Sequence, residues 1–320
     1  MTEKKKTRVI AFANQKGGVS KTSSALNVCY AFTELGKNVL LIDMDSQASA
    51  SLNLGIDVDE EETGTIDALL QPMITNQVKY RSWAEIQSCI QTPTFTDRQR
   101  DPENKMQWIT LDTPFGVNGR YDIIPSSILL AVVELQMGLA SGSAGRYVPI
   151  YLERIIDVIK KFGDYDYIVL DCPPSLSGLF LNSVYAAIDG VIAVSSLDIM
   201  SLRGIDNLIE SVESVSKIRP EHRGILGIMF GLFSERRKVD KDLNYYAKKY
   251  LPIPVFDSKI PESADAKKAN SSMLLLSQLN KKCNAAYIDL ANEIDFAISN
   301  PDEPVGSQKY LEPDEESDDE

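Results

Sequence analysis

Short runs of almost purely apolar residues alternate along this chain with longer segments in which apolar residues recur every three or four positions. The first two apolar runs cover 7–13 and 38–43, and they bracket a helically spaced set, Ala25, Val28, Cys29, Phe32 and Leu35. Continuous apolar runs are typical of strands buried on both faces, and three-to-four spacing is typical of an amphipathic helix. Gly36 suits the end of that helix. The segment therefore predicts a strand–helix–strand unit.

The same alternation continues to about residue 256. We expect further helices over 148–159, 178–187, 202–217 and 243–250, and further strands over 167–171, 190–195, 225–232 and 254–256. Repeated strand–helix units favour a doubly wound, mostly parallel sheet flanked by helices, which is an α/β fold.

Two segments depart from the pattern. Residues 72–119 are polar and rich in turn formers, with one short helix indicated by Trp83, Ile86 and Ile90. We interpret this stretch as an insertion in a single domain over 1–300. Residues 301–320 are acidic and contain three prolines, so we expect a disordered tail.

Composition narrows the class of protein. The chain has 320 residues, of which 43% are hydrophobic and 25% charged, as in ordinary globular proteins. No run approaches the ~18 apolar residues of a membrane span, and the start predicts a strand rather than a signal peptide. The four cysteines are scattered and there is one histidine, so a reduced, cytoplasmic protein is expected. A Ser-His-Asp, Cys-His or multi-histidine metal site is disfavoured.

The net charge of −13 is unevenly distributed. Residues 217–282 hold 14 Lys or Arg against 7 Asp or Glu, which leaves −20 on the rest of the chain. A local basic segment in an acidic protein indicates either an anionic partner or simply a solvated surface.

The stretch "ANQKGGVSKTSS" at 13–24 joins the first strand to the first helix. Glycines let backbone N–H groups turn toward an anion, and the helix start adds partial positive charge, which predicts a phosphate-binding loop. Lys21 stands where a lysine reaches the terminal phosphates, and Thr22 where a hydroxyl ligates Mg²⁺. Ser20 replaces the glycine of the common pattern.

Two acidic motifs follow later strands. In "LLIDMDSQASAS", Asp43 and Asp45 lie at a strand end, where ligands bind in open α/β sheets. In "YDYIVLDCPPSLSG", four apolar residues lead to Asp171, a carboxylate placed to hold Mg²⁺. Cys172 beside it is expected to be a small buried apolar residue.

The segment Lys16–Thr22 resembles the K-G-G-x-x-K-[ST] signature, or deviant Walker A motif, of the ParA/MinD superfamily of P-loop ATPases. The motifs around Asp45 and Asp171 are similar to that family's second and third motifs, and Ala13–Gln15 looks like the ParA/Soj partition branch. The resemblance covers most of 7–295. It implies a P-loop NTPase fold, with ATP and Mg²⁺ as cofactors.

The resemblance also implies roles. Lys16 would reach the ATP of the other protomer in a homodimer, Lys21 would bind phosphate, and Asp45 would position the attacking water, so these three are the expected catalytic residues. Thr22, Asp43 and Asp171 would hold the metal. The segment 258–270 resembles the family's adenine loop, and 195–204 resembles the segment that makes dimer and DNA contacts. The expected nucleotide contacts are Gly17, Gly18, Val19, Ser20, Lys21, Thr22, Ser23, Pro261, Glu262 and Asp265.

The function that this resemblance implies is ATP-dependent DNA partition (plasmid or chromosome segregation). An ATP-bound homodimer would bind double-stranded DNA nonspecifically, and a ParB-like centromere-binding adaptor would stimulate its weak intrinsic ATPase, in the cytoplasm and on the nucleoid. Three alternatives remain: positioning of another cargo such as a protein organelle, membrane cycling of the MinD type, and an iron-protein relative. An acidic C-terminus and scattered cysteines disfavour the last two.

We expect DNA phosphates to be contacted by basic residues, because such contacts dominate nonspecific affinity. Since the phosphate loop begins near residue 13, no helix-turn-helix domain is expected ahead of it. The candidate DNA-binding residues are Arg203, Arg219, Arg236, Arg237, Lys238, Lys267 and Lys268.

Overall fold

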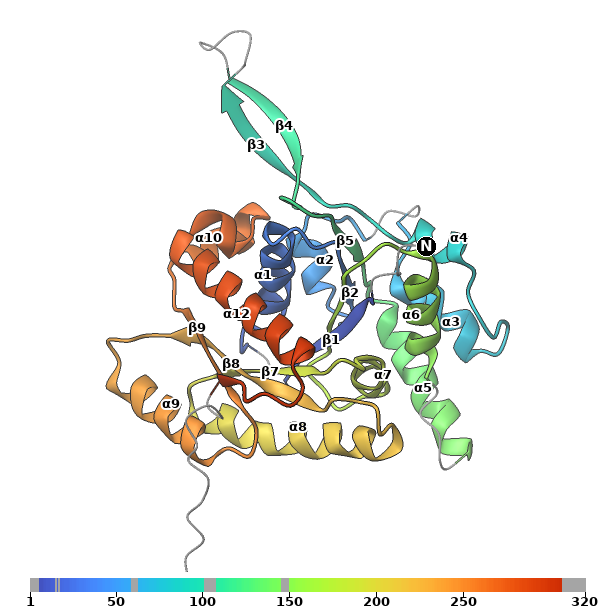
Figure 1. Ribbon diagram of the computed structural model, residues 1–320. Coiled ribbons are helices and arrows are strands. Elements are labelled where there is room, and N and C mark those ends of the chain that lie inside the picture. Colours follow the sequence, from blue (N-terminus) through green and yellow to red (C-terminus); the bar gives the residue numbers. More distant parts are fainter. Residues whose placement is uncertain are drawn as a thin grey trace, which may run out of the picture.

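The computed structural model describes residues 6–306 except 15, 17, 59–62, 101–107 and 145–149. Within them, a seven-stranded sheet has the order β5-β2-β6-β1-β7-β8-β9, and each neighbouring pair is parallel. The expected doubly wound α/β fold is confirmed (Figure 1). Its strands are β1 (Arg8–Ala13), β2 (Val39–Asp43), β5 (Tyr121–Ile124), β6 (Tyr167–Asp171), β7 (Val191–Ser196), β8 (Ile225–Phe233) and β9 (Val255–Pro261).

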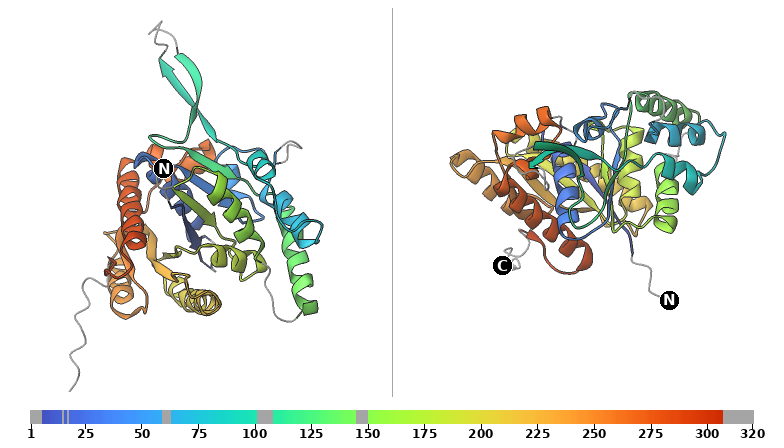
Figure 2. Two further views of the ribbon diagram at one scale, coloured as in Figure 1. Left: turned by 45° about the vertical axis from the view of Figure 1, so that its right-hand side comes forward. Right: turned by 90° about the horizontal axis from the view of Figure 1, so that it is seen from above.

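Helices cover both faces of the sheet because successive strand residues point to opposite sides. Val9 packs into one apolar core and Ile10 into the other. The first core is closed by α3 (Ile66–Ile74), α5 (Leu130–Ala144), α6 (Tyr151–Phe162), α7 (Gly178–Ala186) and α8 (Ile199–Ile218). The second is closed mainly by α1 (Lys21–Glu34) and α12 (Lys281–Ser299), and Figure 2 shows the layers from two further sides.

The described part of the chain holds five further helices. They are α2 (Ser49–Asn53), α4 (Trp83–Ser88), α9 (Lys238–Tyr250), α10 (Asp265–Ser272) and α11 (Leu276–Leu279).

The predicted insertion holds structure that its polar sequence concealed. The short helix is confirmed as α4, although Ile90 lies beyond its end. An antiparallel ribbon of β3 (Thr94–Arg100) and β4 (Trp108–Pro114) follows and projects from the body (Figures 1 and 2). Its base is held where the Phe95 and Phe115 rings lie 5.2 Å apart. Strand β5, directly after the insertion, and helix α12 were not predicted from the sequence.

Several expectations concern the ends of elements and of the chain. Helix α6 begins at Tyr151, and the expected start at Val148 lies outside the described residues. Of the predicted tail 301–320, residues 307–320 also lie outside them, whereas Val305 is buried in the second core. Strand β9 extends to Pro261, five residues past the predicted end at residue 256, and pairs with β8 there. Among the helices in the described part of the chain, none has the length and apolarity needed to cross a bilayer.

Candidate nucleotide-binding site

The carboxyl ends of β1, β2, β6 and β7 bring the predicted motifs together. Asp43 at the end of β2 pairs in register with Asp171 at the end of β6, and Phe12 of β1 pairs with Asp171 from the other side. Three motifs that are far apart in the sequence therefore meet at one edge of the sheet, as ligand sites in open α/β sheets do.

The predicted phosphate-binding loop leaves β1 and turns into α1 through left-handed backbone. Gly18 has φ of 79°, no atom lies within 4 Å of the position that a Cβ would take there, and the residue is exposed. Ser20 has φ of 67° and ψ of 21° and makes no side-chain cap to α1. A left-handed non-glycine residue costs roughly 1–2 kcal/mol, so Ser20 carries backbone strain in the loop. Gly17 lies outside the described residues.

Lys21, in the first turn of α1, reaches the carboxylate of Asp171 at the end of β6. Its Nζ lies 2.7 Å from Asp171 Oδ1, and both side chains are buried. Burial by itself lowers the pKa of Lys21, but the adjacent Asp171 charge outweighs it and the pKa is raised. The other oxygen, Asp171 Oδ2, is buried and has no hydrogen-bond partner among the described residues. A buried, unpartnered carboxylate oxygen fits a divalent cation.

Asp43 is the second buried carboxylate at this point. It accepts hydrogen bonds from the Ser51 amide at 3.0 Å, the Ser51 hydroxyl at 2.8 Å and the Asp45 amide at 3.2 Å. Burial and the neighbouring Asp171 charge raise its pKa to about 7. Asp43 and Asp171 thus repel one another, and a cation between them would relieve that repulsion.

Thr22 lies beside Lys21 on the first turn of α1, so its hydroxyl is available as a third oxygen ligand. In the part of the chain that the structure describes, no group of three His, Cys, Asp or Glu side chains is arranged as a metal site. Two carboxylates and a hydroxyl, completed by phosphate oxygens and water, match the preference of Mg²⁺ for few protein ligands.

Asp45 begins the turn that leads from β2 to α2. Its carboxylate accepts a hydrogen bond from the Gln47 amide at 3.0 Å, and its carbonyl accepts one from the Ala48 amide at 2.9 Å. Three residues after Asp45, Ala48 has left-handed backbone with φ of 49°, which keeps this turn tight. Asp45 is therefore held near the two metal-site carboxylates without pairing to a cation of its own in any described contact.

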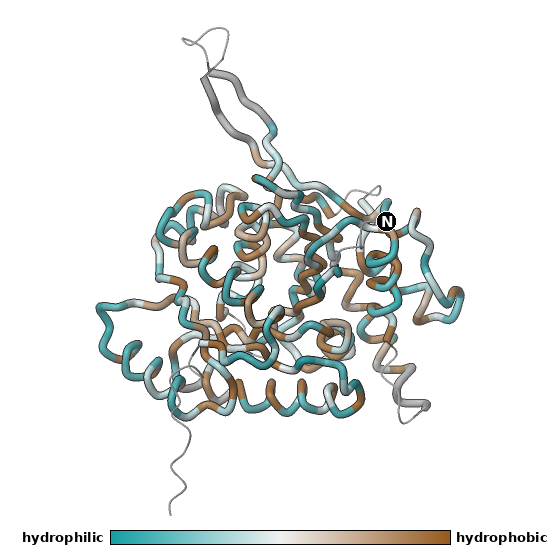
Figure 3. The backbone as a smooth tube through the Cα atoms, in the orientation of Figure 1, coloured by the Kyte–Doolittle hydropathy of each residue, from teal (hydrophilic) through white to brown (hydrophobic). Residues whose placement is uncertain are grey.

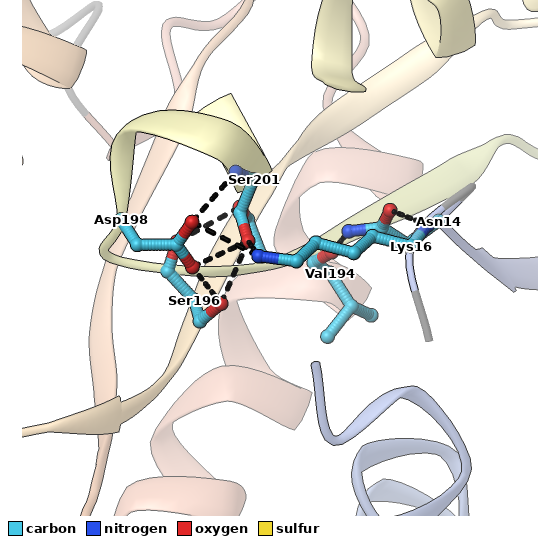
Figure 4. A network of polar contacts seen from close by, with 7 residues as sticks. Asn14, Lys16, Val194, Ser196, Asp198 and Ser201 are labelled. Carbon is cyan, nitrogen blue, oxygen red and sulfur yellow. Dashed lines mark hydrogen bonds and ion pairs between the residues drawn. The ribbon is translucent and has the colours of Figure 1, made fainter. Parts of the chain in front are cut away.

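Lys16 lies apart from Lys21 and points toward the start of α8 (Figure 4). Its Nζ donates to Asp198 at 3.0 Å and to Ser201 Oγ at 2.9 Å. Asp198 also caps α8 by accepting from the Ser201 amide at 2.8 Å, and Ser196 donates to it at 2.7 Å. Partial burial by itself raises the pKa of Asp198, but these hydrogen bonds outweigh it and hold the pKa well below its usual range.

Asn14 fixes the loop from the β1 side. Its side-chain oxygen accepts from the Lys16 amide at 2.7 Å, and its amide nitrogen donates to the Val194 carbonyl (Figure 4). The network of Asn14, Ser196, Asp198 and Ser201 was not predicted as part of the site, and neither was Ser51. The segment 195–204 had been noted only by resemblance.

The predicted adenine loop lies at the end of β9. The Glu262 amide donates to the Phe233 carbonyl at 2.9 Å, and Asp265 accepts from the Asn280 side chain at 2.9 Å. Pro261 is the last residue of β9 and pairs in register with Phe233. These contacts shape the loop, but none of them joins Pro261, Glu262 or Asp265 to the phosphate loop.

The structure divides the candidate DNA-binding residues between the two ends of the sheet. Arg236, Arg237 and Lys238 are exposed just past the carboxyl end of β8, on the same edge as the phosphate loop. Lys267 and Lys268 are exposed on α10, and Arg203 lies on α8, with its side chain outside the described set.

Arg219 lies elsewhere. It precedes the amino end of β8, a strand that spans roughly 30 Å. Its guanidinium pairs with Glu153 at 2.6 Å and Glu221 at 3.1 Å, and donates to the Tyr185 carbonyl at 2.8 Å. Arg219 is thus not brought together with the other candidates.

The fold and this constellation define a class of protein. A phosphate loop between a buried strand and a helix, with a buried aspartate at the end of a neighbouring strand, is the arrangement of P-loop ATPases. The AAA domain family model matches residues 7–223, more than half of the chain, which therefore belongs to that family and to its ParA/MinD superfamily.

Individual relatives agree. The chain is 28% identical to the chromosome partitioning protein ParA of Caulobacter vibrioides, over 90% of this chain and 93% of that protein. It is also 28% identical to the sporulation initiation inhibitor protein Soj of Bacillus subtilis, over 90% and 98%. The cobyrinic acid a,c-diamide synthase of Mycobacterium smegmatis, solved with an ATP analogue and magnesium, shares the fold with a TM-score of 0.68 at 24% identity, over 94% and 99%.

Proposed function

We propose that this chain is a Mg²⁺-dependent ATPase of low intrinsic activity that acts in DNA partition as an ATP-bound homodimer. The observation that carries the ATPase assignment is the contact of Lys21 with Asp171, whose second oxygen is buried without a partner among the described residues. This contact places a cation for phosphate next to a carboxylate for a metal.

The residues divide the work as follows. Backbone amides around Gly18 and the start of α1 receive the phosphates, and Lys21 neutralises them. Thr22, Asp43 and Asp171 would hold Mg²⁺, which when bound would shield the charge that develops on the transferred phosphoryl group. Asp45 orients the attacking water. Since no strong base is required, positioning and charge account for the rate.

Dimer formation is supported by the position of Lys16. Its ammonium group is held at the surface of the site by Asp198 and Ser201, with 42% of the side chain exposed, and has no contact with Asp171. Because Lys21 already serves the phosphates of its own site, Lys16 is available to a second protomer that faces this edge. The ATP of one site would then be enclosed by Lys16 of the other protomer.

The DNA assignment is supported by charge and by the named relatives. Arg236 and Lys238 are exposed at the edge of the sheet that would face a second protomer, and Lys267 and Lys268 are exposed within the predicted adenine loop. A paired molecule would join two such surfaces. We propose that they bind double-stranded DNA nonspecifically, on the nucleoid in the cytoplasm, and that a ParB-like adaptor triggers hydrolysis and release.

The decisive experiment measures binding to a random-sequence DNA duplex with ATP, ADP or no nucleotide at several salt concentrations. We expect binding with ATP only, and a steep loss of affinity with salt because counterions are released on phosphate contact. Arg236→Ala with Lys238→Ala should flatten the salt dependence, whereas Arg219→Ala should leave it unchanged. ATP hydrolysis without ATP-dependent DNA binding would refute the DNA assignment and favour positioning of a cargo by another route.

A further inference from the structure

Helix α5 has two apolar sides, and only one of them is buried. Leu130, Val133 and Met137 pack into the core beneath the helix. On the opposite side, large apolar side chains are between 45% and 70% exposed. We call them the outer face of α5: Val132, Leu135 and Leu139 on the helix, with Ile128 and Leu129 in the turn directly before it.

The outer face is unusual for a solvated helix. Helices that are apolar all round are normally buried, because exposing apolar side chains to water is unfavourable. Over Leu130–Ala144 the sequence supplies one charged residue, Glu134. Figure 3 shows this brown stretch at the periphery of the molecule. An exposed apolar stripe of this kind marks a contact with another molecule.

The spacing of the outer face identifies what fits it. On the helix, Val132, Leu135 and Leu139 follow one another at intervals of three and four residues, the seam spacing by which one helix packs along another. A stable dimer of this chain would need about 20–30 residues on each side, far more than this stripe offers. Helix-in-groove recognition, by contrast, uses three or four anchors.

Helix α5 and the residues before it are also connected to the candidate metal site. The Ser126 amide, four residues before α5, donates to Ser51 Oγ at 3.0 Å, and that hydroxyl donates to Asp43 at 2.8 Å. At the middle of α5, Met137 abuts Gly178, where an added Cβ would lie 3.3 Å from Met137 Cβ. Gly178 begins α7, directly after the segment that follows Asp171. Helix α5 and the residues directly before it therefore contact the two segments that lie next to Asp43 and Asp171.

We propose that the outer face of α5 docks an amphipathic helix of the partner protein that stimulates ATP hydrolysis, an inference that rests on the proposed function. The bound helix would lay its apolar stripe along Val132, Leu135 and Leu139 and shift the two segments that position Asp43 and Asp171. The neutral surface implies that the contact is apolar and depends little on salt.

The test uses a labelled synthetic peptide of about 18 residues, with leucine at the heptad a and d positions and lysine or glutamate elsewhere. That length is marginal as a helix in isolation, so the helix forms on binding. By fluorescence anisotropy without nucleotide, we expect saturable binding to the full chain with a Kd on the order of 10 µM. Leu135→Glu should weaken it at least tenfold.

Two controls keep the result specific. Ile218→Glu places the same charge on an exposed apolar residue of a different helix, α8. Ile218 is 75% exposed, and this variant should leave binding unchanged. A peptide with alanine at the a and d positions should not bind. Absence of binding to the wild-type chain, or equal binding to Leu135→Glu, overturns the docking site whatever the ATPase assay shows.

The remaining outcomes separate docking from catalysis. With ATP and Mg²⁺, the leucine peptide should raise turnover of the wild-type chain and not of Leu135→Glu; binding without stimulation refutes the coupling to the metal site. In sedimentation, we expect the wild-type chain to show no self-association that is lost in Leu135→Glu. If such self-association is seen and no peptide binds, the outer face pairs two copies of this chain and the partner helix is refuted.

Discussion

Lys16 is held within its own protomer by Asp198, 3.0 Å from Nζ, with Ser201 at 2.9 Å. If Lys16 serves the site of a second protomer, dimerisation must break this ion pair. Asp198→Asn keeps a capping oxygen for α8 but removes the charge. We expect the dimer Kd in ATP to fall about threefold to fivefold, the scale of an exposed ion pair worth up to ~1 kcal/mol.

Sedimentation of Asp198→Asn with ATP measures this effect. Lys16→Gln is its counterpart and should bind ATP but fail to dimerise or hydrolyse it. Ser196→Ala, which removes one hydrogen bond to Asp198 and no charge, should change the dimer Kd little. Weaker dimerisation of Asp198→Asn would mean that Asp198 acts in the dimer rather than against it.

Lys21→Ala should abolish ATP binding, because it removes the phosphate cation. It also leaves Asp171 buried without its partner, and losing one member of a buried pair costs about 3–5 kcal/mol. Binding should therefore be measured by calorimetry at a temperature where circular dichroism shows a folded chain. Lys79→Ala, at an exposed lysine, serves as the control. Tight ATP binding by Lys21→Ala would refute the phosphate-loop assignment.

Asp45→Ala should bind ATP and form dimers but lose at least tenfold in turnover, since the role proposed for its carboxylate is to orient water rather than substrate. Its DNA complex with ATP should consequently persist, which a dissociation rate measured by surface plasmon resonance will show. Glu213→Ala, an exposed carboxylate on α8, should behave as wild type. Normal turnover of Asp45→Ala would remove Asp45 from the catalytic residues.

Ser20→Gly should stabilise the chain by roughly 0.5–1 kcal/mol. Glycine relieves the left-handed strain at φ of 67°, although part of that gain is offset by the extra freedom of the unfolded chain. Ser20→Val, with a branched Cβ in the same conformation, should destabilise it. Thermal unfolding of the three proteins orders them, and a lower melting temperature for Ser20→Gly would show that the hydroxyl contributes more than the strain costs.

His222 gives the fold a dependence on pH. Burial lowers the pKa of this histidine, whose Nε2 lies 2.9 Å from the Val184 carbonyl and whose Nδ1 accepts from the Gly224 amide at 3.0 Å. The unfolded chain therefore takes up this proton at a higher pH than the folded one. The free energy of unfolding should fall below about pH 6.5, by at most about 1.4 kcal/mol per pH unit.

Urea unfolding between about pH 5 and pH 7.5 tests this prediction. His222→Gln should be less stable at neutral pH and should flatten the profile, so the difference between the two proteins isolates the histidine. An identical slope in both would assign the loss of stability at low pH to the carboxylates instead.

The sequence predicted the βα framework, and the candidate phosphate and metal residues that the structure brings to one edge of the sheet, because both leave local signals. Buried parallel strands such as 167–171 are continuous apolar runs, and the motifs stand directly at their ends. Strand β5 gave no such signal, since its four residues YDII include Asp122, which is satisfied by the Tyr165 hydroxyl at 2.7 Å and by Thr92 at 2.6 Å. Contacts with distant segments, rather than the local sequence pattern, therefore determine that these residues form a strand.

The partners of Lys16 were missed for a similar reason. Asp198 is 182 residues away, and nothing near Lys16 in the sequence indicates which carboxylate its ammonium will meet. The candidate DNA-binding residues were likewise grouped by their positions in the sequence. Arg219, however, pairs with Glu153 of α6, so its charge is neutralised within the protein. Composition locates charge along a chain but not on a surface.

The register of β2 on β6 restricts how this protein can change length. Asp43 faces Asp171 only because the five-residue strands Val39–Asp43 and Tyr167–Asp171 pair without offset. A single residue gained or lost within either strand would turn one carboxylate to the opposite face of the sheet. Insertions and deletions can therefore accumulate only in connections that end outside this pairing, and the β3–β4 ribbon lies in such a connection.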